Sequence, residues 1–230
     1  MGLLRDPVAD SLSPRMQNAA FAALALDVAY VPLGVVPERL PEAVRGLVAL
    51  GFLGANVTTP HKLAVGALCD ELEGGIESVN TLAIRDGRVI GSSTDTAALD
   101  DRRPETAAVI GAGGAATAWI AELQARGAVV DVYSRSGQWP PRTEHAAVVV
   151  HATPVKDELL FEPRPGQTVI DLSYRAEGGE TAHAAAARAA GCELVDGLDV
   201  LVAQGAASFE VWTGLPAPVD VMRPAVRSPA

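Results

Sequence analysis

Residues 106–116 read TAAVIGAGGAA, and this stretch decides the fold because an apolar run there meets a glycine-rich turn. A helical pattern over 117–126 and a second apolar run over 129–133 follow. In this strand–turn–helix–strand setting, the GxGxxA motif at 111–116 lets the backbone approach a pyrophosphate at a helix N-terminus. We therefore expect a dinucleotide site, with a glycine-rich packing turn as the alternative. The expected nucleotide contacts are Gly111, Ala112, Gly113, Gly114 and Ala115.

The segment after the second apolar run indicates which dinucleotide binds. Residues 134–136 read SRS, and no acidic residue stands where an NAD site usually carries one for the ribose 2′-hydroxyl. An arginine between two hydroxyls suits a 2′-phosphate, so Ser134, Arg135 and Ser136 favour NADP over NAD; a solvated arginine in a turn is the alternative. The stretch 136–152 is short and contains Gln138-Trp-Pro-Pro, which breaks helix. The adenine half of the domain is therefore expected to be shortened.

Composition bounds the class of protein. With 230 residues, 49% of them hydrophobic and only 4% aromatic, the chain can bury an aliphatic core as one large or two small domains. The net charge of −10 argues against nucleic acid and anionic membranes as partners, and an acidic substrate would need a local cation. No apolar run nears the roughly 18 residues of a membrane span, and the first ten residues lack a signal pattern, so we expect a cytoplasmic protein. Two cysteines in unrelated segments and four histidines without metal-ligand spacing predict reduced thiols and no metal.

The pattern along the chain alternates strands and helices. This alternation predicts an α/β protein whose largely parallel sheet is covered by helices on both faces. The charged, proline-ended run at 100–104 marks a boundary between domains 1–100 and 101–199. One expected helix begins at Ser13, and the others cover 37–50, 60–68, 117–126, 181–190 and 198–212. Expected strands cover 28–33, 52–58, 106–110, 129–133, 146–150, 168–172 and 193–195, with a hairpin of 78–85 and 88–91.

Polar side chains follow the strands of the first half. The stretch NVTTPHK at 56–62 delivers an amide, hydroxyls and a lysine directly after an apolar run. Further polar groups follow at Ser11, Ser13, Asn80 and the pair 94–95. Ligands of open α/β sheets bind beyond the carboxyl ends of strands, so these groups predict a site for a polar substrate. A capped strand-to-helix turn is the alternative for 56–62.

The ordered set of motifs resembles the shikimate dehydrogenase family over nearly the whole chain. The matching segments are SLSP at 11–14, NVTTPHK at 56–62, SVNT at 78–81, STD at 93–95, GAGGAA at 111–116, SRS at 134–136, HATP at 151–154, DLSY at 171–174 and DGLDVLVAQGAASFEVWTG at 196–214. The resemblance implies an oxidoreductase that interconverts 3-dehydroshikimate and shikimate with NADP, on the pathway to aromatic amino acids. It also implies a Rossmann-like second domain for the cofactor and a first domain for the substrate, onto which 200–230 fold back.

The resemblance assigns roles position by position. Lys62 and Asp95 match the catalytic pair. A lysine ammonium can stabilise the oxygen of a ketone under reduction and donate its proton, while a carboxylate holds the ammonium. The remaining matches are Ser11, Ser13, Asn56, Thr58, Asn80, Tyr174 and Gln204 for the substrate, and Thr153 and Gly197 beside the glycine turn and 134–136 for the cofactor.

Several positions depart from the family pattern and leave the substrate open. Asp10 stands beside Ser11, where a histidine is frequent, Gln17 replaces a histidine, and Ser93 replaces the asparagine of an NTD motif. A quinate or aminoshikimate dehydrogenase therefore remains an alternative, as does a protein that binds shikimate and NADP with weak catalysis. The expected partner is a small-molecule substrate, and the expected state is a monomer or homodimer.

Overall fold

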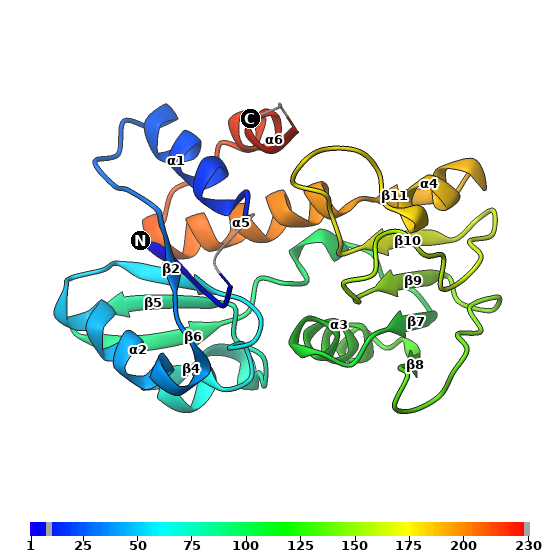
Figure 1. The fold of residues 1–230 in the computed structure, drawn as a ribbon, viewed down its shortest axis with the longest axis horizontal. Coiled ribbons are helices and arrows are strands. Elements are labelled where there is room, and N and C mark those ends of the chain that lie inside the picture. Colours follow the sequence, from blue (N-terminus) through cyan, green and yellow to red (C-terminus); the bar gives the residue numbers. More distant parts are fainter. Residues whose placement is uncertain (8–10, 228–230) are drawn as a thin grey trace. The chain divides into compact units, whose positions relative to one another are not determined.

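The strand that contains the TAAVI run lies in the second of two α/β units of the computed structural model, which describes residues 1–7 and 11–227 (Figure 1). Unit 2 comprises Thr96–Leu201. Unit 1 comprises Met1–Asp95 together with the segment that begins at Val202 and is described as far as residue 227. The division falls within helix α5, Gly197–Thr213. No helix in the described ranges is long and apolar enough to span a membrane.

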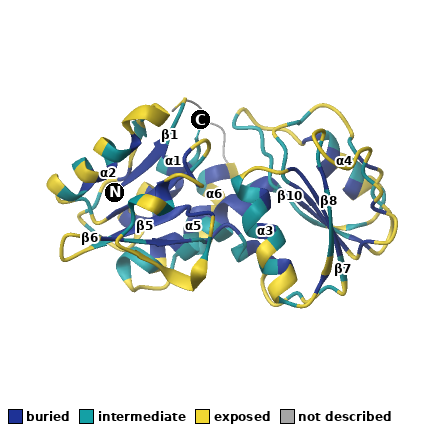
Figure 2. Ribbon diagram, turned by 90° about the horizontal axis from the view of Figure 1, so that it is seen from below, coloured by how far each residue is buried: buried dark blue, intermediate teal, exposed yellow. Residues whose placement is uncertain are grey.

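Unit 2 is built on a fully parallel sheet in the order β11-β10-β9-β7-β8. All four residues of β9 are buried, as expected of a strand covered on both faces. Figure 2 shows the neighbouring strands β7 and β10 mostly in the dark blue of buried residues. The expected strands at 106–110, 129–133 and 193–195 are confirmed to the residue. The strand expected over 146–150 differs by two residues at its start and one at its end, and that over 168–172 by one residue at its end. The elements are β7 Thr106–Ile110, α3 Gly114–Ala125, β8 Val129–Tyr133, β9 Val148–His151, β10 Thr168–Asp171, α4 Ala182–Ala189 and β11 Glu193–Val195, with the 3-10 turn η4 Ala97–Leu99.

The strand order of unit 2 reverses at β7, which makes the carboxyl end of this strand the topological switch point of the sheet. The chain passes from β7 to β8 on one side and reaches β9 on the other, so the order of strands reverses there, and ligands of such sheets bind at this point. Gly111 follows β7 with φ +131°, and a Cβ at this residue would lie 2.5 Å from the carbonyl oxygen of Ala152. Only glycine allows the two loops to approach this closely.

Unit 1 contains a mixed sheet in the order β2-β1-β3-β5-β6-β4. The expected hairpin is confirmed, with positive φ at both turn residues, Asp86 and Gly87, as a tight two-residue hairpin requires. Because the hairpin reverses the chain, β5 runs antiparallel to β3 and β6, and the expected parallel pairing holds for the other strand pairs. The strands are β1 Gly2–Arg5, β2 Val31–Gly34, β3 Gly54–Val57, β4 Glu71–Leu72, β5 Thr81–Arg85 and β6 Arg88–Ser92.

Helices α1 and α6 pack against each other in unit 1. The helix expected over 60–68 is wrong: residues after Pro60 form tight turns, in which His61 N–H bonds to the Thr58 carbonyl. His61 and Lys62 are both buried, and a helix would point consecutive side chains apart. The helices of this unit are α1 Ser13–Ala23, α2 Leu40–Ala49, the later part of α5 and α6 Val219–Arg227, with 3-10 turns η1 Pro37–Arg39, η2 Val65–Leu68 and η3 Glu73–Gly75.

Candidate active site

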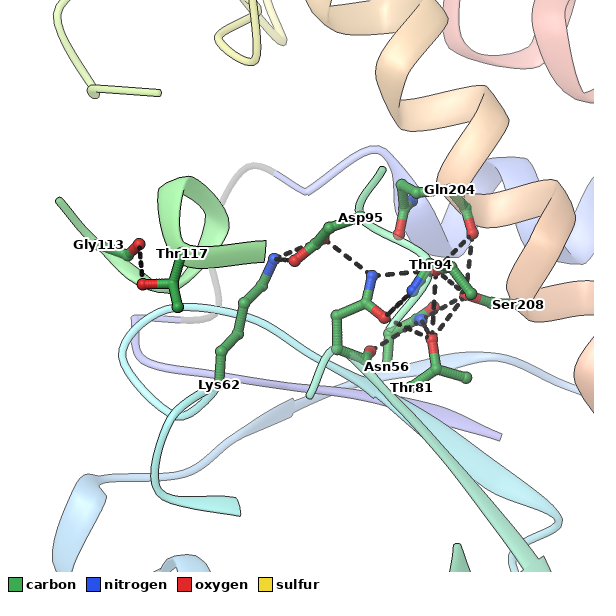
Figure 3. A network of polar contacts seen from close by, with 10 residues as sticks. Asn56, Lys62, Thr81, Thr94, Asp95, Gly113, Thr117, Gln204 and Ser208 are labelled. Carbon is green, nitrogen blue, oxygen red and sulfur yellow. Dashed lines mark hydrogen bonds and ion pairs between the residues drawn. The ribbon is translucent and has the colours of Figure 1, made fainter. Parts of the chain in front are cut away.

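A buried ion pair lies at the ends of two strands of unit 1. Lys62 stands in the turn after β3 and Asp95 directly after β6, and the Lys62 Nζ lies 2.7 Å from Asp95 Oδ1 and 2.6 Å from Oδ2 (Figure 3). The two side chains are only 11% and 9% exposed. A charge this far from water needs a partner, which each supplies to the other. The arrangement holds an ammonium, a proton donor, in one place.

Asn80 fixes the carboxylate of this pair. Its Oδ1 accepts the backbone N–H of Thr94 at 2.8 Å and the hydroxyl of Thr81 at 2.8 Å, which sets the orientation of the amide. The Nδ2 group must then point the other way, where it donates to Asp95 Oδ1 at 2.9 Å and to Thr94 Oγ1 at 3.0 Å. Both amide protons are used, so the structure places Asn80 as a support of Asp95.

Three hydroxyls connect this support to Asn56 on β3. Ser208 Oγ lies 2.9 Å from Thr81 Oγ1 and 3.0 Å from Thr94 Oγ1, and it accepts a bond from Asn56 Nδ2 at 2.9 Å. Asn56 Oδ1 in turn accepts the hydroxyl of Tyr30 at 2.9 Å. Burial raises the pKa of the Tyr30 phenol, which therefore remains a hydrogen-bond donor. The polar atoms of Asn56 are thus engaged inside unit 1.

Helix α5 contributes to the network through two positions one turn apart. The Gln204 carbonyl accepts the hydroxyls of Thr94 at 3.0 Å and Ser208 at 2.9 Å. Figure 3 shows the Gln204 side chain on the side of α5 that faces Asp95. Ser208 was not anticipated from the sequence, although its spacing of four residues from Gln204 places it on the same helix face.

The predicted carboxylate-binding hydroxyls lie at the start of α1. Ser11 Oγ accepts the backbone N–H of Ser13 at 3.3 Å, and Ser13 is the first residue of the helix. The partly exposed Thr58 follows β3, and its hydroxyl bonds to no residue in the described part of the chain. Asp10, noted in the sequence as a departure beside Ser11, lies outside the described residues.

Gln17, noted in the sequence as a departure, is buried against α5. Its Nε2 donates to the Gly205 carbonyl at 2.9 Å, while its Oε1 has no partner among residues 1–7 and 11–227. The amide therefore fastens α1 to α5 next to Gln204.

The predicted nucleotide turn lies at the crevice of unit 2. Gly113 precedes α3, which begins at Gly114, so the first amides of the helix point out of the turn over 111–115. Gly111 N–H donates to the Tyr133 carbonyl at 2.8 Å, which places the start of this turn beside Ser134, Arg135 and Ser136. A helix N-terminus beside an arginine and two serines can bind phosphate groups.

Three other predicted residues also lie in unit 2. Thr153 Oγ1 lies 2.5 Å from His151 Nε2 and accepts the Val155 N–H at 3.3 Å, so its hydroxyl is engaged within its own loop. A Cβ at Gly197 would lie 2.1 Å from the Ser173 carbonyl oxygen, so glycine there permits close packing of α5. Tyr174 is partly exposed in the segment after β10. Their predicted ligand contacts stay predictions.

Two histidines that are distant in sequence meet Asp171 beneath the Thr153 loop. His151 Nδ1 lies 2.8 Å from Asp171 Oδ1, and the rings of His151 and His183 stack with centroids 3.9 Å apart. His183 Nε2 accepts the Leu160 N–H at 3.0 Å, so its proton sits on Nδ1 and neither nitrogen offers a lone pair to a metal. Burial, with His151 beside it, lowers the pKa of His183 to about 4. The cluster joins the ends of β9 and β10 to α4 and serves the structure.

Comparisons with known proteins agree across the chain. The family model "Shikimate dehydrogenase substrate binding domain" matches residues 3–82, and "Shikimate 5'-dehydrogenase C-terminal domain" matches 197–227. The NADP(+) shikimate dehydrogenase of Anaeromyxobacter sp. (strain Fw109-5) is 40% identical over 270 positions, which cover 99% of this chain and 95% of that protein. Since this chain has 230 residues, that relative holds insertions that are absent here.

Solved structures share the fold. Shikimate 5-dehydrogenase of Thermus thermophilus, in complex with NADP(H) and shikimate, superposes with a TM-score of 0.84 at 30% identity over 98% of this chain and 97% of that one. A 5-ketofructose reductase of Gluconobacter sp. strain CHM43 gives a TM-score of 0.81 at 26% identity over 98% and 96%. With this similarity along its whole length, the chain belongs to the shikimate dehydrogenase family.

Proposed function

We propose that the chain catalyses the reversible, NADP-dependent reduction of 3-dehydroshikimate to shikimate, a step in the biosynthesis of aromatic amino acids. Membership of the family and the names of its relatives support the activity and the cofactor. The observation that carries the proposal is the buried pair of Lys62 Nζ and Asp95, at 2.6 Å and 2.7 Å. It provides a fixed acid for a ketone oxygen.

Different residues of unit 1 have different roles in the proposed reaction. NADPH, when bound, supplies the hydride to the carbonyl carbon. The Lys62 ammonium stabilises the negative charge that develops on the oxygen and donates a proton to it; in the reverse direction its amine accepts the proton. Asp95 holds the ammonium, and Asn80 holds Asp95. The network around Asn56 keeps these groups from rotating.

The substrate also needs contacts away from the reacting carbon. Ser11 and Ser13 are assigned to its carboxylate, because hydroxyls donate without adding charge in a chain of net charge −10. Thr58, Gln204 and Tyr174 are assigned to the ring hydroxyls. Asn56 and Asn80 are likewise assigned to substrate contacts, and their side chains also bond to neighbours within unit 1.

The donor set of unit 2 fits NADP. The amides at the start of α3 and the backbone of the Gly111 turn suit a pyrophosphate. Arg135 forms no ion pair within the described ranges and is flanked by Ser134 and Ser136, which suits a 2′-phosphate. Thr153 would complete the cofactor site through its backbone, and Gly197 through the close packing of α5 that a glycine allows.

The wider organisation forms part of the same proposal. Residues 1–100 with 200–230 would bind the substrate, and 101–199 the cofactor. The only partner proposed is the small-molecule substrate, for a monomer or homodimer that acts in the cytoplasm.

The test is consumption of NADPH with 3-dehydroshikimate, with NADH in parallel. Quinate, an aminated shikimate and 5-ketofructose serve as rival substrates, the last because of the structurally similar reductase. Lys62→Ala should lower turnover at least about a hundredfold, while Arg88→Ala, which removes an exposed cation of the same unit, should not. If the folded protein binds shikimate but oxidises no NADPH, the proposed activity is rejected and the chain is a binding protein.

A further inference from the structure

The loop over 134–142, SRSGQWPPR, folds back over the carboxyl end of β8 and is called the Trp139 loop below. Ser134 N–H donates to the Gln138 carbonyl at 3.1 Å, and Gly137 N–H donates to the Ser134 carbonyl at 3.0 Å. The Tyr133 hydroxyl, at the end of β8, donates to the Arg142 carbonyl at 2.7 Å. These bonds fasten the loop to the end of β8 on both sides of Trp139.

Trp139 presents its indole to solvent. It is 39% exposed, whereas Trp119, in the same unit, is fully buried, and the indole N–H of Trp212 donates to a carbonyl inside unit 1. No ring contact joins Trp139 to another aromatic side chain of the described residues. A large planar apolar surface is therefore available at a position that the backbone holds in place.

Two arginines flank Trp139 in the sequence of the loop. Arg135 and Arg142 are exposed, and neither forms an ion pair with any residue that the structure describes. By contrast, Arg164 and Arg175 of the same unit pair with acidic residues. The loop over 134–142 contains two arginines and no acid, in a chain of net charge −10, although Asp131 and Glu144 lie just outside it.

The Trp139 loop stands where adenosine would bind. In dinucleotide folds the residues after the second strand contact the adenosine ribose. Here the glycine turn follows β7 and the Trp139 loop follows β8, and these two strands are paired neighbours in the sheet. A flat aromatic ring is a stacking platform for a base, and arginine guanidinium groups bind phosphate in a bidentate manner.

We propose that two further residues of the Trp139 loop complete the 2′-phosphate site expected at 134–136: Trp139 stacks on the adenine, and Arg142 joins Arg135 on the 2′-phosphate. The proposal rests on the proposed use of NADP and adds two residues, Trp139 and Arg142, to the expected contacts. It makes the shortened loop the determinant of cofactor choice.

The test is calorimetric titration of the full chain with adenosine 2′,5′-bisphosphate, which carries adenine and the 2′-phosphate without nicotinamide. Trp139→Ala should raise the Kd about tenfold or more, and Trp139→Phe should restore most of the affinity. Arg142→Ala should weaken this ligand at least about fivefold and leave adenosine 5′-phosphate nearly unchanged. Matched controls are Leu159→Ala, which removes another exposed apolar side chain of unit 2, and Arg164→Ala, which removes a paired arginine.

A second readout is the emission of Trp139, which stacking of adenine should quench in the wild type and not in Trp139→Phe. Unchanged affinity, within twofold, in both Trp139→Ala and Arg142→Ala would overturn the inference even if the chain reduces 3-dehydroshikimate with NADPH. Conversely, tight Trp139-dependent binding in a chain without that activity would support the loop site and reject the proposed function.

Discussion

Replacing Lys62 with methionine should separate what the ion pair contributes to stability from what it contributes to catalysis. Methionine keeps the unbranched shape and most of the length of the side chain and removes the charge. Asp95, 9% exposed, would retain Asn80 as its one remaining side-chain donor among the described residues. Removing one partner of a buried pair typically costs about 3–5 kcal/mol of unfolding free energy, and we expect Lys62→Met to fall in this range.

The double variant Lys62→Met with Asp95→Asn removes both charges. An asparagine at 95 still accepts the bond from Asn80, so the double variant should lie within about 1.5 kcal/mol of the wild type. Its turnover should remain at least about a hundredfold below that of the wild type, because the proton donor is absent. Stability would thus return without activity.

Urea unfolding gives the free energies, and absorbance of NADPH gives the turnover. The two units can unfold separately, so unit 1 should be followed through Trp212 in a background where Trp119 and Trp139 are phenylalanine. Additive losses, with the double variant as unstable as the sum of the singles, would refute the account of a coupled buried pair. Turnover of Lys62→Met within tenfold of the wild type would refute its role as the acid.

Four further outcomes follow from the same geometry. Ser208→Ala should raise the KM for shikimate several-fold with little change in kcat and cost about 1–2 kcal/mol, whereas Thr213→Ala, which removes a similar helix bond away from the network, should leave KM unchanged. Gly111→Ala should weaken NADP binding at least about tenfold in a direct titration, since its Cβ would lie 2.5 Å from a carbonyl oxygen. Arg135→Ala should raise the Kd of NADPH more than that of NADH, and equal losses would contradict phosphate recognition. Burial lowers the pKa of His183 from 6.5, its ordinary value, to about 4 in the fold. The free energy of unfolding should therefore be highest above pH 6.5 and fall by up to about 3 kcal/mol as the pH drops toward 4, because only the unfolded chain binds a proton there. Urea unfolding of His183→Gln should show a weaker dependence on pH.

The second half of the chain could be predicted closely because its signals were local. Strands of β-branched and alanine residues, a glycine turn and a helix follow one another within 106–133, and the bounds of β7 and β8 agree with the structure. Buried parallel strands are continuous apolar runs, which a sequence displays directly.

The errors arose where tertiary contacts decided the conformation. Strand β1 is a four-residue segment, too short to show a period, and α6 contains Pro224, which argues against a helix when read alone. The turn at Lys62 was predicted as a helix because the burial of His61 and Lys62 is not visible in the sequence.

The pair of Lys62 and Asp95 could be predicted only as a matched motif. Nothing in a separation of thirty-three positions indicates that the two side chains meet, and the structure shows them in contact. The amide orientation of Asn80 and the hydroxyl of Ser208 depend on the packing of α5 against the hairpin, which no local pattern encodes.

Unit 1 is assembled from both ends of the chain, and this has a consequence for biosynthesis. A ribosome completes Thr96–Leu201 before Val202–Ser228 is made, so Asn56, Thr81 and Thr94 emerge long before Ser208 can close over them. During that interval the side chains of Asn56 and Thr81 lack the hydroxyl partner that α5 later supplies. A chain truncated before residue 202 would therefore leave this buried polar network of unit 1 incomplete.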